Sequence, residues 1–152
     1  MTATQSISIS NGPVHSGTEK KIRERRKSCR LRLFVEELRV MGGFAADDGV
    51  GIAATGIVKG NTVSGINGGP GSGIGISATG IVAGNYASGN RIFGIAVGQG
   101  STVVGNTVTQ SEDFGISVDC PSNVTNNTAV NSVFRNLVLN GTGCNATNNV
   151  AP

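Results

Sequence analysis

Short hydrophobic runs recur along the chain, and each contains a Gly-Asn or Asn-Asn pair. The runs read GIVKGNTVSG from Gly56, GIVAGNYASG from Gly80 and TVVGNTVTQ from Thr102, and two more copies follow toward the C-terminus. One Asn stands at the same place in every copy, and successive copies are 24, 21, 21 and 22 residues apart: Asn61, Asn85, Asn106, Asn127 and Asn149. A nearly fixed period of this length indicates a repeat architecture.

Apolar residues hold fixed places around each Asn. The position three residues earlier is Val58, Val82, Val103, Val124 or Ala146, and the position two residues later is Val63, Ala87, Val108, Ala129 or Ala151. Apolar pairs spaced by two stand eleven and nine residues before the Asn, as in Val50 and Ile52, Ile74 and Ile76, Ile95 and Val97, and Ile116 and Val118, with Leu137 and Leu139 one residue farther out. Spacing by two is the alternation of a strand, and the frequent Gly and Asn exclude helical repeats.

A unit of this size with short strands cannot bury its own apolar face, so successive units must stack. We therefore predict an all-β fold, a parallel β-helix of about six coils with repeats of 21–24 residues, over residues 29–152. The five repeated Asn residues are interpreted as a structural ladder at one corner. Asn tolerates the left-handed backbone of a sharp corner, and its amide both donates and accepts hydrogen bonds.

Composition agrees with a narrow solenoid, because Gly accounts for 24 of the 152 residues and Trp is absent. No apolar run is long enough for a membrane span, and we expect no secretory leader in this sequence. Basic residues concentrate at the start: residues 1–40 hold nine Lys and Arg against four Asp and Glu.

The segment before the repeats divides in two. Residues 1–14 resemble a partial upstream coil, whereas residues 15–28 are basic and break the repeat pattern. Three interpretations of residues 15–28 remain open: a short exposed helix, a nucleic-acid patch, or a reading-frame error. A nucleic-acid partner is disfavoured because no aromatic residue is interleaved among the basic ones.

Residues 35–152 resemble the right-handed parallel β-helix repeat proteins of bacteria, which share their fold with pectate lyases. The five Gly-Asn or Asn-Asn copies and the closing stretch CPSNVTNNTAVN to CNATNNVAP carry the resemblance. It implies a right-handed coil and a secreted or surface-associated protein, of which this chain would be a C-terminal part. It also implies polysaccharide as the partner.

Enzymes of this fold act on polysaccharides with several carboxylates, and some pectate lyases bind calcium. The candidates for catalysis here are Asp47, Asp48 and Asp119, and the only histidine, His15, lies outside the repeats. Neighbouring residues of a strand face opposite sides, so Asp47 and Asp48 fit a turn better than a paired site. The favoured function is a non-catalytic scaffold that contacts carbohydrate, with no metal or cofactor. The alternative is a lyase or hydrolase of an acidic polysaccharide, for which calcium is an option.

Two further pairs are expected from the repeat register. Arg91 and Glu112 occupy the same place in neighbouring coils and should form an exposed ion pair. Cys120 and Cys144 are 24 residues apart, close to one period, so they can meet within the Cα separation of a disulfide. Whether they are oxidised depends on the compartment, which only the resemblance suggests. Cys29 should be unpaired.

Overall fold

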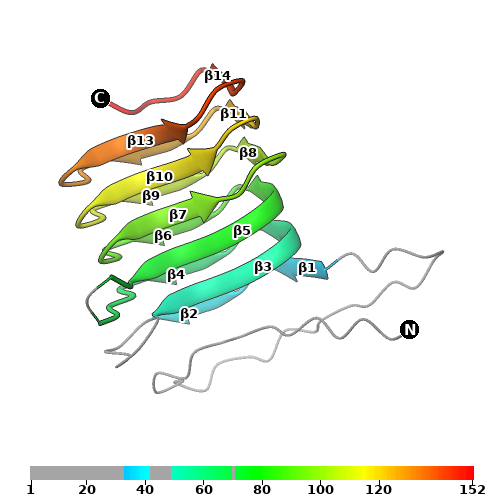
Figure 1. Cartoon of the computed structure of the whole chain (residues 1–152). Coiled ribbons are helices and arrows are strands. Elements are labelled where there is room, and N and C mark those ends of the chain that lie inside the picture. Colours follow the sequence, from blue (N-terminus) through cyan, green and yellow to red (C-terminus); the bar gives the residue numbers. More distant parts are fainter. Residues whose placement is uncertain (1–32, 42–48, 70) are drawn as a thin grey trace.

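The computed structural model describes residues 33–41, 49–69 and 71–152, and these residues form a parallel β-solenoid of about five turns. The predicted segments 1–14 and 15–28 lie outside the described residues, as do His15, Cys29, Asp47 and Asp48. Figure 1 shows the strands stacked in one direction, with each front strand above its predecessor from β3 to β13. We call the strands at the front of Figure 1 the front strands: β3, β5, β7, β10 and β13. They run left to right as the coil rises, so the solenoid is right-handed. The predicted fold class is confirmed, with about five turns in place of about six.

Each full turn has three faces. The strands are β1 (Leu33–Glu36), β2 (Arg39–Met41), β3 (Val50–Lys59), β4 (Thr62–Ser64), β5 (Ile74–Ala83), β6 (Tyr86–Ser88), β7 (Phe93–Val97), β8 (Thr102–Val104), β9 (Thr107–Thr109), β10 (Phe114–Asp119), β11 (Asn123–Thr125), β12 (Thr128–Val130), β13 (Arg135–Asn140) and β14 (Asn145–Thr147). The first face holds the start of β3 and of β5 with β7, β10 and β13. The second holds β1, the ends of β3 and β5, β8, β11 and β14, and the third holds β2, β4, β6, β9 and β12.

Apolar columns from all three faces fill the interior. The columns are Ile52, Ile76, Ile95 and Ile116 with Ala78, Val97 and Val118 on the first face, Val58, Val82, Val103 and Val124 on the second, and Val63, Ala87, Val108 and Ala129 on the third. Every one of these side chains is buried. The columns predicted three residues before and two residues after each Asn are therefore correct over these coils.

The first-face register differs from the prediction at the third coil. Ile95 pairs with Ile76, and Phe93 pairs with Ile74, whereas counting back from the Asn had aligned Ile95 with Ile74. The cause is the corner between the first two faces. Strand β5 passes through this corner without interruption, from the first face to the second. In the next turn the residues Gly98 to Ser101 separate β7 from β8, which adds two residues at the corner. Counting back from Asn106 therefore shifts the first-face alignment by two residues.

A ladder of hydrogen bonds joins the repeated Asn residues at the corner between the second and third faces. The Asn106 side-chain amide donates from Nδ2 to Oδ1 of Asn127 at 2.9 Å and to the carbonyl oxygen of Val82 at 2.8 Å. Its own Oδ1 accepts from the backbone N–H of Asn85 at 3.0 Å and from Asn85 Nδ2 at 2.9 Å. The same pattern continues from Asn61 to Asn149, so the predicted structural ladder is present.

The prediction that the repeated Asn itself adopts the left-handed backbone is wrong, because the residue before it does so. The left-handed backbone belongs to the residue before each ladder Asn: Gly60, Gly84 and Gly105 at φ of 65°, 60° and 62°, and Asn126 and Asn148 at 56° and 55°. A Cβ added at Gly105 would meet nothing within 4 Å. The ladder Asn is therefore selected by its amide, and its predecessor by tolerance of positive φ.

Candidate functional site

A shallow, open groove of about 760 Å³ crosses the outer surface of the first face. Small side chains in register form its floor: Ala53 pairs with Ser77, Ser77 with Ala96, and Ala96 with Ser117. Because none of these side chains is longer than Ser, the surface is hollowed along the stacking direction. The groove therefore crosses strands β3, β5, β7 and β10.

A polar row borders the groove near the corner between the first and second faces. It consists of Thr55, Thr79, Asp119 and Asn140, with Gly98 between Thr79 and Asp119. Asn140 Nδ2 donates to Ser117 Oγ at 3.0 Å and to Asp119 Oδ1 at 3.2 Å. The row thus presents hydroxyl, amide and carboxylate oxygens on one side of the groove.

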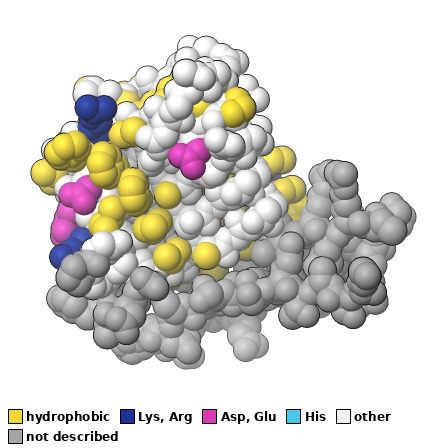
Figure 2. Space-filling view, in the orientation of Figure 1, with side chains coloured by type: hydrophobic (Ala, Val, Ile, Leu, Met, Phe, Trp, Pro, Cys, Tyr) yellow, Lys and Arg dark blue, Asp and Glu magenta, His cyan; other side chains and the backbone are white. Residues whose placement is uncertain are grey.

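A stack of three aromatic rings begins at one edge of the groove, near the starts of β7 and β10. Phe93, which also lines the groove, stacks on Phe114 with ring centroids 5.1 Å apart, and Phe134 meets Phe114 edge-on at 5.5 Å. We call Phe93, Phe114 and Phe134 the Phe ridge. Phe134 is 69% exposed. In Figure 2 hydrophobic side chains gather along this side, next to a broad surface of other side chains and backbone that one acidic side chain interrupts.

A column of glycines behind the Phe ridge explains the repeated Phe-Gly-Ile sequence. A Cβ on Gly94 would lie 2.2 Å from Val108 Cγ1 and 2.9 Å from Ser111 Oγ, and one on Gly115 would lie 2.8 Å from Ser132 Oγ. Ser111 is fully buried at the corner between the third and first faces. Glycine is therefore needed for the corner side chains to pack. On either side of it, Phe93 and Phe114 are partly exposed, whereas Ile95 and Ile116 are buried.

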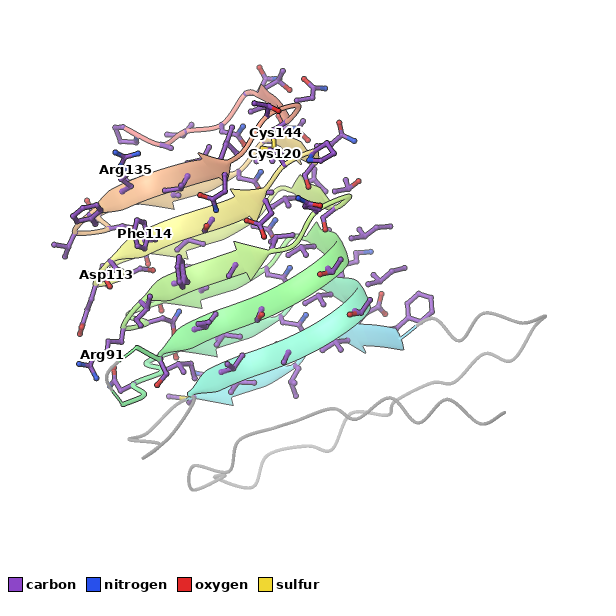
Figure 3. All side chains as sticks on the ribbon, viewed as in Figure 1. Arg91, Asp113, Phe114, Cys120, Arg135 and Cys144 are labelled. Atoms are coloured by element: carbon purple, nitrogen blue, oxygen red, sulfur yellow. A yellow bond between two sulfur atoms is a disulfide. The ribbon has the colours of Figure 1, made fainter. Side chains whose placement is uncertain are left out.

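The charged residues near the Phe ridge do not form the predicted ion pair. Figure 3 shows Arg91, Asp113 and Arg135 at the edge where the front strands begin. Arg91 donates from Nη1 to the carbonyl oxygen of Gly68 at 2.6 Å. No ion pair joins Arg91 to Glu112, so the predicted cross-coil pair is absent from the described residues.

Of the predicted catalytic carboxylates, the structure places Asp119 at the groove. Asp119 is exposed at the end of β10, as strand alternation predicted. Asp47 and Asp48 lie outside the described residues, so their relation to Asp119 stays a prediction. Within the described ranges, no cluster of three or more His, Cys, Asp and Glu side chains could hold a metal ion. No helix there could cross a membrane.

A disulfide joins Cys120 to Cys144 beside the polar row. The Cα atoms are 5.0 Å apart, and the pairing is the one that the spacing of 24 residues predicted. Cys120 follows β10 and Cys144 precedes β14, so the bridge ties together two turns at the corner of the first and second faces, as Figure 3 shows.

Sequence reasoning missed both the groove and the Phe ridge. A signal for the ridge was present, since Phe-Gly-Ile occurs at Phe93 and again at Phe114, 21 residues later. The groove floor carried no comparable signal, because Ala and Ser are common at exposed strand positions of any kind.

Comparison of the chain with protein-family models, with curated proteins and with solved structures finds no match. The kinship with bacterial pectate-lyase-like proteins thus stays a prediction, and the groove is the basis for any functional argument.

Proposed function

We propose that this protein is a non-catalytic β-helix scaffold that contacts carbohydrate through the groove on its first face. The observation that carries the proposal is the pairing of Phe93, the member of the Phe ridge that lines the groove, with a row of hydroxyl, amide and carboxylate groups on the opposite side. Sugars offer both kinds of surface, since C–H groups pack on apolar side chains and hydroxyl groups exchange hydrogen bonds with polar ones.

Three hydroxyl groups of the groove are free to bind a ligand. The side chains of Thr55, Ser77 and Thr79 make no hydrogen bond to any other residue that the structure describes. Each hydroxyl can donate one hydrogen bond and accept two. Their repetition in successive turns suits a ligand that itself repeats, such as an extended polysaccharide.

The charges of the groove favour binding over catalysis. Asp119 is the one ionisable side chain among the described residues that line it. Glycoside hydrolysis generally uses two carboxyl groups on either side of the scissile bond, and elimination needs a base close to the abstracted proton. A lyase or hydrolase would therefore need groups beyond those that line the groove.

An exported or surface location is part of the same proposal. Disulfides persist in oxidising compartments, so the bridge between Cys120 and Cys144 supports a location outside the cytoplasm. Polysaccharides of cell walls and matrices would be accessible there.

The test is affinity electrophoresis of the full chain in gels that contain soluble polysaccharides: hydroxyethylcellulose, galactomannan, dextran and polygalacturonate. At least one polymer should retard the protein without being cleaved. Ser117→Tyr places a bulky ring in the groove floor and should weaken that binding by at least about tenfold, because it fills the contact surface.

The matched control is Thr128→Tyr, on the third face of the same turn as Ser117. Tyr86 already occupies the third-face column that contains Thr128, so this position accommodates the ring. Thr128→Tyr should bind as the wild type does. Equal loss in both variants, or no retardation by any polymer, would contradict a groove that binds carbohydrate, and release of new reducing or unsaturated ends would favour the enzyme.

A further inference from the structure

We infer that the groove selects uncharged glycans over polyuronates, and that Asp119 makes this selection. The inference rests on the proposed function and adds the class of ligand. It runs against the acidic polysaccharides on which pectate-lyase-like enzymes would be expected to act.

Among the residues that the structure describes, the ionisable side chain lining the groove is an acid. The described basic side chains lie elsewhere: Arg39 on β2 of the third face, Lys59 at the end of β3 on the second face, and Arg91 and Arg135 at the edge where the front strands begin. No Lys or Arg is among the described residues that line the groove, whereas Asp119 is. A uronate chain lying there would meet a carboxylate, with no compensating cation among the described lining residues.

The Asp119 carboxylate is also held in position. Asn140, its neighbour in the next turn, bridges it to Ser117 through one amide nitrogen. Only Oδ1 of Asp119 accepts from that amide, so Oδ2 is left to accept a hydrogen bond from a ligand. Hydrogen bonds from sugar hydroxyls to an ionised carboxylate are charge-assisted and stronger than those between neutral groups.

The same carboxylate therefore has opposite effects on the two classes of ligand. It strengthens the binding of a hydroxyl-rich neutral chain and repels a uronate group. Two like charges about 4 Å apart in water repel enough to weaken binding about fivefold. Added salt should screen that repulsion.

The experiment measures the affinity of the full chain for hydroxyethylcellulose, galactomannan and polygalacturonate, at low and at moderate ionic strength. Wild-type protein should bind one of the two neutral polymers more tightly than polygalacturonate. Asp119→Asn keeps the size of the side chain and removes its charge. It should weaken neutral binding by about threefold to tenfold, strengthen polygalacturonate binding about fivefold, and reduce the effect of salt on the latter.

Glu112→Gln is the matched control. It removes one negative charge from an exposed side chain outside the groove lining, so it separates a local effect from a change in net charge. If Glu112→Gln shifts the two affinities as much as Asp119→Asn does, or if wild-type protein prefers polygalacturonate, the selection by Asp119 is overturned and carbohydrate binding stands. If wild-type protein binds none of the polymers, the proposed function and this inference fall together. Circular dichroism of each variant should match that of the wild type, since both side chains are exposed.

Discussion

The buried amides of Asn85, Asn106 and Asn127 are fully used. Within the ladder, Oδ1 accepts two hydrogen bonds from the preceding Asn, and Nδ2 donates one bond to the next Asn and one to a carbonyl oxygen of the adjacent turn. Asn106 is 1% exposed, so water cannot replace these bonds. Asp offers no donors in its ionised form and Ala offers nothing, which explains why the sequence repeats Asn at this place.

Asn106→Ala should therefore destabilise the protein strongly. It leaves buried partners unsatisfied on both sides, each at about 1–3 kcal/mol, so we expect a loss of about 3 kcal/mol or more in the free energy of unfolding. The matched variant is Asn149→Ala, at the partly buried end of the ladder, where water can bond the freed groups. It should cost about 1 kcal/mol. Urea denaturation measures both, and equal losses would show that the ladder adds little beyond local packing.

At the scale of strands, the sequence was informative wherever an element buries its side chains. The columns of Val82 and Val108 were predictable because every turn must place an apolar residue at the same interior point. The offset at Ile95 was not, because it arises at the corner after β7, where Gln99 and Gly100 are exposed and can vary in number without disturbing the core. The groove escaped prediction for a related reason, since it depends on small outward side chains that the core does not constrain.

The disulfide links the end of β10 to the start of β14, and its loss should destabilise mainly the last turn. Reduction removes a cross-link across 24 residues between the end of β10 and the start of β14, which is worth about 3 kcal/mol by the entropy of loop closure. Cys120→Ala combined with Cys144→Ala should lower the urea midpoint to that of reduced wild-type protein and should not respond to dithiothreitol. Both proteins would carry Cys29→Ser, so that no third thiol exchanges. Alkylation of all thiols in unreduced wild-type protein would instead show that the bridge does not form.

At the scale of the whole molecule, the solenoid is most protected in its middle turns. In the described structure β14 pairs only with β11, and β13 only with β10, so the last turn has one open side. Its residues are correspondingly accessible: Leu139 is 37% exposed and Val150 57%, whereas Ile95 is fully buried. Repeat proteins gain stability from neighbouring units, so a unit with one neighbour opens more readily than a unit with two.

The decrease in burial and strand pairing from the middle turns to the last turn predicts which turns open first. Backbone amides of β14 should exchange with deuterium much faster than those of β5 and β8, which lie between paired strands on both sides. Ile95→Ala should cost about 2–5 kcal/mol, because it opens a cavity in the closed interior. Leu139→Ala removes a side chain that is already partly in water and should cost about 1 kcal/mol, with faster exchange confined to the last turn. Two results would contradict this gradient: uniform amide exchange along the chain, or an equal loss in the free energy of unfolding for the two variants. Either would mean that the turns unfold as a single unit and that the last turn is as stable as the central ones.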